Sequence, residues 1–246
     1  MNKNPANFVP LTPISFLHRT ADVYGQNTSV IYENRIYTWS ESRERCVRIA
    51  SSLNSYGVMP GDTVSILAFN TPEMFESHFS IPMAGAVLNS INVRLDAGTI
   101  AHILNDSNAK MLLVDRELFE VASDALSISS SNPKVVLIND AFAESKPNVT
   151  ENTIEYESLV ENGDPSFKWQ KPDDEWQPLS LNYTSGTTGQ PKGVVYHHRG
   201  SYLMSMGTVI GWELPNHPVY LYSVPMFHCN GWGHAWTMAA VAGTVI

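Results

Sequence analysis

The stretch YTSGTTGQPKGV, residues 183–194, combines three glycines, three threonines, one serine and one lysine. The glycines make the backbone flexible, and the threonines and serine supply many hydroxyl groups. An element packed in the core needs neither property. Placed between two strands, it would present N–H groups and hydroxyls to a phosphate, and Lys192 would add a positive charge. Surface turns share this composition, so the residue types alone leave both interpretations open.

The loop does not follow the Walker A pattern G-x-x-x-x-G-K-[ST]. Counted from Gly186, the sixth position is Pro191, and Lys192 precedes Gly193 instead of Ser or Thr. A P-loop NTPase or a kinase-like protein is therefore disfavoured.

Strand and helix patterns alternate on the N-terminal side of the loop. Thr38 and Glu41 form a capping-box pattern that opens a helix ending at Gly57, and Thr71-Pro72 predicts the start of a second helix. Apolar strands are expected at 63–69, 86–91, 109–115 and 134–140, with further helices at 98–104 and 117–126. This rhythm predicts an α/β fold with mostly parallel sheets flanked by helices.

Around and beyond the loop, strands are expected at 178–183, 194–198 and 219–224. A helix is expected at 200–212, with its Met and aromatic side chains in the core. The final residues AVAGTVI (240–246) predict a helix-ending glycine and then the start of a strand without a partner. From this we expect a fragment or a truncated product.

The distribution of charge along the chain suggests domain boundaries, and the composition argues against some classes of binding partner. The net charge is −9, and residues 139–178 hold ten acidic against three basic side chains. We therefore expect a first α/β subdomain at 1–138, a solvated acidic connector at 139–177, and the start of a second α/β subdomain at 178–246.

The charge argues against a nucleic-acid partner, and no apolar run is long enough for a membrane span or a secretory signal. Cys46 and Cys229 lack metal-site spacing and are expected to be reduced, buried thiols.

The order of residues from Tyr183 to Gly193 closely resembles the signature loop of the adenylate-forming enzymes: acyl-CoA synthetases, luciferases and peptide-synthetase adenylation domains. The resemblance implies that the loop wraps the β- and γ-phosphates of ATP while a carboxylate attacks the α-phosphorus, giving acyl-AMP and pyrophosphate. It implies nucleotide contacts from Thr184, Ser185, Gly186, Thr187, Thr188, Gly189 and Lys192.

A second segment, PMFHCNGWG (225–233), resembles the PxFHxNG segment of acyl-CoA synthetases, which lines the acid pocket. The resemblance implies a substrate-binding role for His228, Asn230, Gly231 and Trp232. Taken alone, His228 would be an ordinary core or surface histidine, and no metal site is expected. Trp232 and Trp236 either narrow the pocket toward small or aromatic acids or pack in the core.

Two further segments are interpreted more conservatively. NSINVRLD (89–96) is similar to the NxRL segment of plant-type acyl-activating enzymes, and we interpret Asn92 and Arg94 as structural residues paired at a strand end. Of His197 and His198, at most one can face a phosphate, because neighbouring strand residues point to opposite faces.

The family pattern continues beyond Ile246, to the YGxTE segment whose Glu holds Mg²⁺, the ribose-binding Asp, the hinge and the lysine of a C-terminal domain. We therefore expect an incomplete N-terminal domain of an acid–CoA ligase that uses ATP, Mg²⁺ and CoA on a small carboxylic acid, with no catalytic residue in this chain and no turnover by it alone. An amino-acid-activating member is disfavoured, because Cys229 and Asn230 stand where such enzymes usually carry an acidic residue. The resemblance is compatible with a cytoplasmic or a peroxisomal location. The alternative is a non-catalytic product that associates with an intact relative through an exposed sheet edge.

Overall fold

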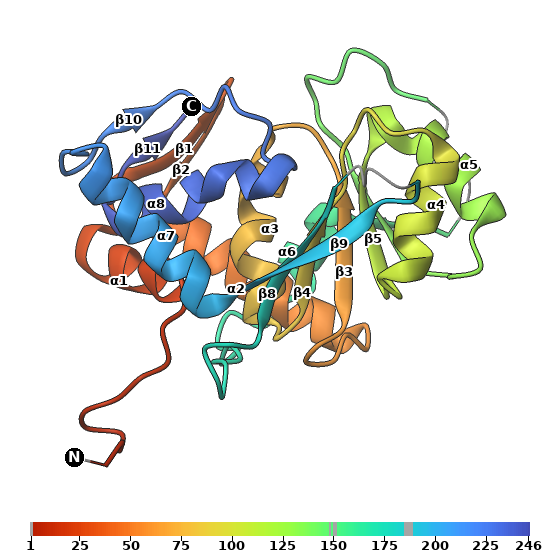
Figure 1. The fold of residues 1–246 in the computed structure, drawn as a ribbon. Coiled ribbons are helices and arrows are strands. Elements are labelled where there is room, and N and C mark those ends of the chain that lie inside the picture. Colours follow the sequence, from red (N-terminus) through yellow and green to blue (C-terminus); the bar gives the residue numbers. More distant parts are fainter. Residues whose placement is uncertain (1, 148, 150–151, 185–188) are drawn as a thin grey trace.

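The computed structural model describes residues 2–147, 149, 152–184 and 189–246. Within these residues the strands form a large sheet of order β7-β6-β5-β3-β4-β8-β9 and a small sheet of order β10-β11-β1-β2 (Figure 1). The strands are β1 (Thr28–Tyr32), β2 (Arg35–Thr38), β3 (Thr63–Leu67), β4 (Val87–Ser90), β5 (Met111–Asp115), β6 (Lys134–Ile138), β7 (Ile154–Glu155), β8 (Pro178–Thr184), β9 (Lys192–His197), β10 (Val219–Tyr220) and β11 (Thr244–Val245).

Helices cover both faces of the large sheet. They are α1 (Ile14–Tyr24), α2 (Trp39–Ser55), α3 (Pro72–Met83), α4 (Ala97–Asp106), α5 (Phe119–Ile128), α6 (Tyr156–Asn162), α7 (His198–Gly211) and α8 (His234–Ala240), with short helical turns η1 (Arg116–Leu118) and η2 (His228–Gly233). None of the helices in the described part of the chain is long and apolar enough to cross a membrane.

The large sheet is parallel except for its last strand, because β9 pairs antiparallel with β8. Its strands have two buried faces, as parallel strands between helices require. Ile66 and Leu113 pack with α2 and α3, whereas Leu67, Leu112 and Val114 pack with the apolar residues of α4 and α5. Figure 1 shows the two groups of helices on opposite sides of the sheet.

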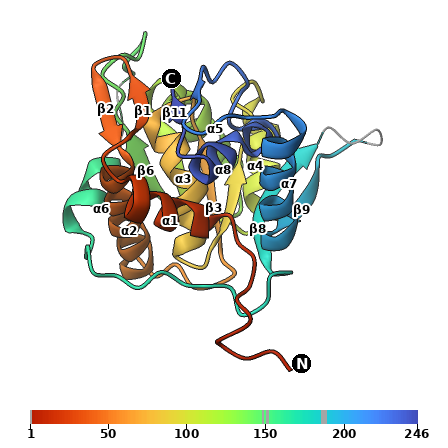
Figure 2. The ribbon, with the colours of Figure 1, turned by 90° about the vertical axis from the view of Figure 1, so that its left-hand side faces the viewer.

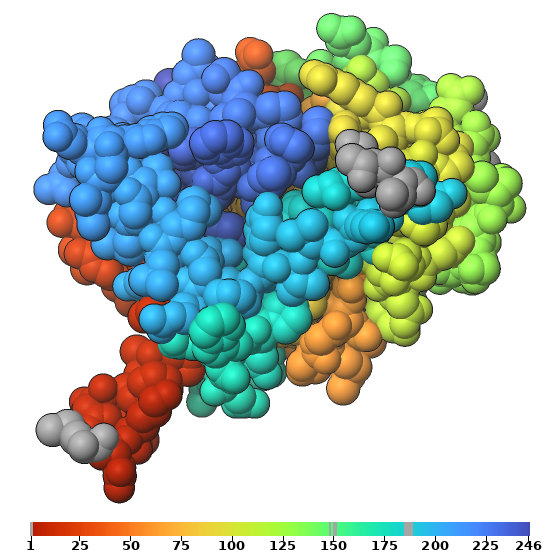
Figure 3. All heavy atoms as spheres, in the orientation of Figure 1, coloured from red at the N-terminus to blue at the C-terminus, as the bar shows by residue number. Residues whose placement is uncertain are grey.

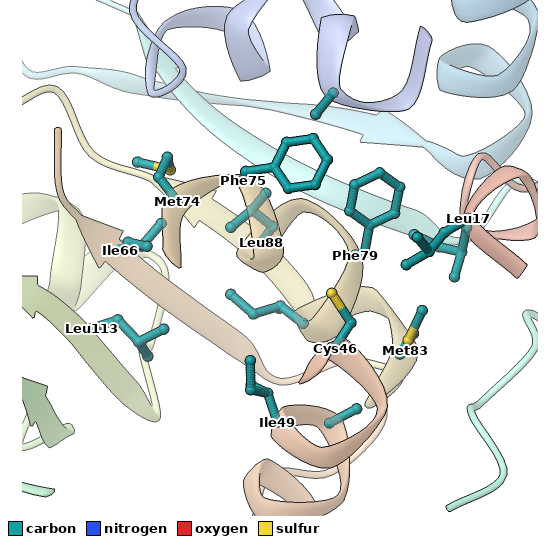
Figure 4. Packing of buried hydrophobic residues seen from close by; sticks show 14 of the residues in the cluster. Leu17, Cys46, Ile49, Ile66, Met74, Phe75, Phe79, Met83, Leu88 and Leu113 are labelled. Carbon is teal, nitrogen blue, oxygen red and sulfur yellow. The ribbon is translucent and has the colours of Figure 1, made fainter. Parts of the chain in front are cut away.

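The main core lies between the large sheet and α2 and α3. Phe75 and Phe79 of α3 are almost fully buried there, with ring centroids 5.4 Å apart. In Figure 4 these rings lie close to Leu88 of β4, and Cys46 and Ile49 of α2 lie in the same cluster.

Several expected elements are confirmed. Thr38 caps α2 with the reciprocal Glu41 contacts of a capping box, and the Thr71 hydroxyl caps α3, whose first residue is Pro72. The strands expected at 86–91, 109–115 and 134–140 are present as β4, β5 and β6.

The small sheet corrects the expectation of an unpaired final strand. β11 pairs parallel with β1, with Val245 opposite Val30, and parallel with β10 on its other side. Figure 2 shows the C-terminus beside these strands and the N-terminal segment leading away from the opposite end of the molecule. The strand expected at 219–224 is only Val219–Tyr220, because the chain then leaves the sheet.

The acidic segment contains more structure than a solvated connector. Residues 154–162 form β7 and α6, in which Tyr156 and Leu159 are buried. The Ser52 hydroxyl of α2 donates to the Leu159 carbonyl at 2.6 Å, so α6 is anchored to α2.

The expectation for residues 200–212 is wrong in one respect. A helix is present there, but Leu203, Met204 and Ile210 of α7 and Trp212 just after it are exposed, and the buried residues of this helix are His198, Ser201 and Ser205. On its other side, Tyr202 and Met206 of α7 pack against the main core, so the core expectation holds for these two residues and fails for the exposed ones. Figure 3 shows α7 and β9 on the same face of the molecule.

Candidate functional site

The residues on both sides of the loop between β8 and β9 form hydrogen bonds to one helix, α4. The Tyr183 hydroxyl donates to Asp106 Oδ2 at 2.6 Å, and the His102 ring N–H donates to the Pro191 carbonyl at 3.2 Å. Burial and the neighbouring Asp106 carboxylate raise the pKa of Tyr183, so this hydroxyl stays a donor. Four residues predicted to bind phosphate, Ser185, Gly186, Thr187 and Thr188, lie outside the described residues.

A cavity of about 550 Å³ opens beside the base of the loop, and we call it the polar cavity. Thr184 and Gly189, on either side of the loop, contribute to its wall. The remaining wall comes from β4, α4, the strands β8 and β9, the residues next to them, and residues 225–233, which we call the His228 segment. These wall residues are Ser90, Asn92, Leu95, Thr99, Ile103, Asn182, Tyr183, Gln190, Pro191, Tyr196, Phe227, His228 and Cys229.

A second cavity, of about 440 Å³, adjoins it and has a mostly apolar wall; we call it the apolar cavity. It lies between β9, α7 and η2, and is lined by Val195, Tyr196, His197, Gly200, Ser201, Met204, His228, Cys229 and Trp232. Three residues, Tyr196, His228 and Cys229, line both cavities. The two cavities therefore meet at the His228 segment.

The His228 segment has an unusual backbone. Cys229, Asn230, Gly231 and Trp232 all have φ between 48° and 57°, so they form a left-handed turn. Three of these four residues are not glycine, and left-handed conformations cost such residues roughly 1–2 kcal/mol each. The Tyr222 hydroxyl donates to the Gly231 carbonyl at 3.0 Å from a buried position and supports the turn.

The structure brings some of the predicted site residues together and separates others. Thr184, Gly189 and His228 line the polar cavity, and Trp232 lines the apolar one. Lys192 lies opposite Thr184 at the start of β9 and is exposed, but it lines neither cavity. Asn230 and Gly231 are buried within the left-handed turn and line neither cavity.

Trp236 is a packing residue. It is fully buried in α8, and its indole N–H donates to the His78 carbonyl at 3.0 Å. Trp232 is 59% exposed at the edge of the apolar cavity, so only Trp232 of the two could contact an acid there.

The two adjacent histidines have separate structural roles. His197 Nδ1 accepts from the Gly200 N–H at 2.9 Å and caps α7, and its ring lies 4.5 Å from that of Trp176. His198 is buried and lies 2.8 Å from the Thr12 hydroxyl. Burial lowers the pKa of His198 to about 4, so it is neutral at physiological pH.

Two buried polar residues in the wall of the polar cavity, Ser90 and Asn182, are not among the site residues predicted from the sequence. Among the described residues, Ser90 Oγ and Asn182 Oδ1 have no hydrogen-bond partner, although each residue is only 5% exposed. A polar residue inside an otherwise apolar strand is the one sequence signal that could have indicated them, since buried polar atoms normally find a partner.

The family model described as AMP-binding enzyme matches residues 17–246, which is most of the chain. The chain belongs to the AMP-binding enzyme family. The family and α/β fold predictions are therefore confirmed.

Members of the AMP-binding family with defined substrates are among the similar proteins. An acetate–CoA ligase of Humulus lupulus (CCL3) is 46% identical over 254 residues, covering 99% of this chain and 45% of that protein. A peroxisomal trans-cinnamate:CoA ligase of Petunia hybrida is 47% identical, covering 97% of this chain and 44% of that protein. The chain thus spans less than half the length of these relatives.

Solved structures of AMP-binding enzymes have the same fold. The anthranilate CoA ligase AuaEII, in complex with anthranoyl-AMP, superposes with a TM-score of 0.85 at 20% identity, covering 99% of this chain and 46% of that one. A long-chain-fatty-acid-CoA ligase of Archaeoglobus fulgidus gives 0.84 at 22% identity, with 97% and 47% covered.

The NxRL segment of this family member forms a turn after β4. Asn92 Oδ1 accepts from the Arg94 N–H at 3.0 Å, which fits the structural interpretation of the pair. Asn92 also contributes to the wall of the polar cavity, whereas the Arg94 side chain is exposed.

Proposed function

We infer that this chain supplies the phosphate loop and the acid pocket of an acid–CoA ligase. ATP, when bound, provides an α-phosphorus that the carboxylate of an organic acid attacks, with pyrophosphate as the leaving group; the acyl-AMP then passes its acyl group to the CoA thiol. The observation that carries this proposal is the junction at His228, where a polar cavity below the loop meets an apolar cavity.

The residues present fit the triphosphate part of ATP. Thr184 contributes a hydroxyl and Gly189 an unobstructed backbone beside the loop, and Ser90 contributes a buried hydroxyl that has no partner in the described part of the chain. Lys192 lies across the hairpin from Thr184 and would add a positive charge. Pre-arranged donors of this kind stabilise negative charge that builds up on a leaving group. The remaining contacts of the predicted set, from Ser185 to Thr188, belong to the same proposal.

The part of the chain that the structure describes holds no group of three or more His, Cys, Asp or Glu side chains that could bind a metal ion. We therefore derive no step through Mg²⁺ from these residues. In the proposal, the metal ligand and the base- and ribose-binding residues belong to the additional length that the relatives have.

The apolar cavity suits the tail of a small carboxylic acid. Met204 and Trp232 form apolar walls, and His228 stands at the junction toward the polar cavity. The carboxylate would lie at this junction, where the His228 ring could hydrogen-bond to it. The named substrates of the relatives, acetate and trans-cinnamate, set the range of acids to test. Because some relatives are named as peroxisomal and others are not, the proposal keeps both a peroxisomal and a cytoplasmic location open.

The test uses a protein that carries this chain together with the rest of the relatives' length. Pyrophosphate release is measured with acetate, butyrate and trans-cinnamate, and we expect at least one acid to be activated. Lys192→Ala should lower the rate about 100-fold, which corresponds to roughly 3 kcal/mol of lost charge stabilisation. Lys168→Ala, an exposed lysine of the acidic segment, is the matched control and should leave the rate unchanged.

Silence with every acid, or an equal rate for Lys192→Ala and Lys168→Ala, would contradict the proposal. The 246-residue chain alone is expected to form no acyl-CoA, because in the proposal it lacks the base, ribose and metal contacts.

One observation favours the alternative of a non-catalytic binding partner. Exposed apolar side chains occur on β9, on α7 and the residue after it, and on η2: Val194, Val195, Leu203, Met204, Ile210, Trp212 and Trp232. Exposed apolar patches of this kind commonly bind other proteins. Co-purification of the 246-residue chain with an intact relative would support this alternative, and its recovery as an isolated monomer would oppose it.

A further inference from the structure

The two cysteines of the chain lie in very different surroundings. Cys46 is fully buried in the core, and burial raises the pKa of its thiol well above the usual value. Cys229 is partly exposed and lies in the wall of both cavities, at the point where they meet. Its Sγ is 3.8 Å from His228 Nε2, so an imidazole nitrogen is in position to accept the thiol proton.

The position of Cys229 is fixed by its surroundings. It begins the left-handed turn of η2, which the buried Tyr222 hydroxyl holds at Gly231. The thiol therefore belongs to a built surface between two cavities and not to a free loop.

A second feature shows that the polar cavity is shaped for a hydrogen-bonding ligand. Ser90 Oγ and Asn182 Oδ1 line this cavity and have no partner within the described protein, although both residues are about 95% buried. Leaving a buried polar atom without a hydrogen bond costs about 1–3 kcal/mol. A ligand with amide or hydroxyl groups would remove this cost and would lie in the same cavity as the Cys229 thiol.

We propose that Cys229 is a covalent modification site, at which a small polar disulfide bound in the polar cavity exchanges with the thiol. The sulfur of Cys229 transfers its proton to His228 Nε2 and attacks one sulfur of the disulfide. The S–S bond of the small molecule breaks, a new S–S bond forms to Cys229, and the second half leaves as a thiolate that takes the proton back from His228. No external oxidant is needed, because the bound disulfide is itself reduced.

The adduct blocks the junction between the two cavities, and any thiol reductant reverses it. The inference does not depend on the proposed function, because the modification is measured on the protein itself and requires no turnover. A chain without ligase activity could still carry this site, and an active ligase could lack it.

The test treats the folded 246-residue chain with glutathione disulfide as the probe and follows the adduct by intact mass spectrometry and peptide mapping. We expect one adduct per chain, at Cys229, formed at a rate that saturates with probe concentration and reversed by dithiothreitol. Cys229→Ser should abolish the adduct and Cys46→Ser should retain it. His228→Ala should lower the rate at saturation.

The docking contacts are tested separately. Ser90→Ala and Asn182→Ala should each raise the half-saturating probe concentration about 10-fold, equivalent to about 1.4 kcal/mol of lost binding, without changing the rate at saturation. Ser55→Ala, an exposed serine of α2, is the matched control. If the cavity variants do not fold, S-methylglutathione added to the unchanged protein should slow alkylation of Cys229 by iodoacetamide.

Three results would overturn the proposal. One is an adduct at Cys229 whose rate rises linearly with probe concentration and is not slowed by S-methylglutathione, which indicates only an accessible thiol. The second is equal reaction of Cys46 and Cys229 in the folded protein. The third is reaction that requires a denaturant.

Discussion

At the residue scale, Gly231 is constrained from two sides. Its φ of 55° is left-handed, and an added Cβ would come within 2.1 Å of the Tyr222 hydroxyl oxygen. We expect Gly231→Ala to lower the free energy of unfolding by about 2–4 kcal/mol, from backbone strain together with overpacking. Urea unfolding followed by tryptophan fluorescence measures the change.

Gly207 of α7 provides the matched control. Nothing lies within 4 Å of a Cβ built there, so Gly207→Ala should leave stability unchanged or raise it by up to about 1 kcal/mol. Equal effects of the two alanine substitutions would show that the left-handed turn is not an energetic constraint.

Single residues also show what the sequence could and could not predict about the site. The loop and the FHCNG segment are local patterns, so they indicated Thr184, Gly189 and His228, which the fold places around one cavity. The burial of Asn182 and the left-handed turn at Cys229 depend on packing between distant segments, which no local pattern encodes. The binding roles of all the predicted site residues stay predictions.

At the scale of elements, α2, α3 and α6 are linked by an ionic cluster in which Glu76 is buried, Arg45 is partly buried and Glu157 is exposed. Arg45 Nε of α2 lies 2.5 Å from Glu76 Oε1 of α3, and an Arg45 Nη2 lies 2.7 Å from Glu157 Oε1 of α6. The Tyr156 hydroxyl donates to the other oxygen of Glu76 at 2.9 Å. Burial raises the pKa of Glu76, and Arg45 opposes this shift, so the arginine is what makes a buried carboxylate tolerable.

We expect Arg45→Met to lower the free energy of unfolding by about 3–5 kcal/mol, because it leaves the Glu76 carboxyl buried without its cation. The double variant Arg45→Met, Glu76→Met should recover most of the loss, since it removes the stranded charge. The measurement is chemical unfolding at neutral pH.

The control for the ionic cluster is Arg43→Met. Arg43 pairs with Asp22, which is 67% exposed, so its loss should cost less than about 1 kcal/mol. A loss at Arg45 no larger than at Arg43 would mean that the buried cluster is energetically no different from a surface pair.

Elements with strong local signals were predictable, and elements set by their environment were not. The capping box at Thr38 and the Pro72 start locate α2 and α3 from a few adjacent residues. For α7 the apolar spacing predicted a helix correctly but not its exposure, because periodicity identifies a face and not what covers it.

At the scale of the whole molecule, buried histidines link stability to pH. Burial lowers the pKa of both His78 and His198 to about 4, from an ordinary value of 6.5. The unfolded chain therefore binds more protons than the folded one between about pH 6.5 and pH 4, so the histidine contribution to stability is present above pH 6.5 and is lost on acidification. Asp115 acts in the opposite direction, because burial raises its pKa to about 6.

We expect the free energy of unfolding to change less between pH 7 and pH 5 in His198→Gln than in the unchanged protein, by on the order of 1–2 kcal/mol. Urea unfolding at the two pH values measures this difference. His217→Gln, an exposed histidine, serves as control. Parallel pH profiles for His198→Gln and the unchanged protein would refute the assignment.

The general architecture was predictable from the chain, because alternating strand and helix patterns lead to a parallel sheet. The division into two sheets was not. The small sheet is made from residues near both ends of the chain, and Val30 opposite Val245 is a pairing that no sequence window contains.

This pairing has a consequence for synthesis on the ribosome. The Thr20 hydroxyl of α1 donates to the Ala239 carbonyl, 219 positions later in the sequence. In the same way, β1 pairs in parallel with β11, which is synthesised much later than β1. During translation, the hairpin of β1 and β2 therefore remains without that neighbour until Val245 has been synthesised. Such late, long-range closure slows folding and leaves an open strand available to chaperones in the meantime.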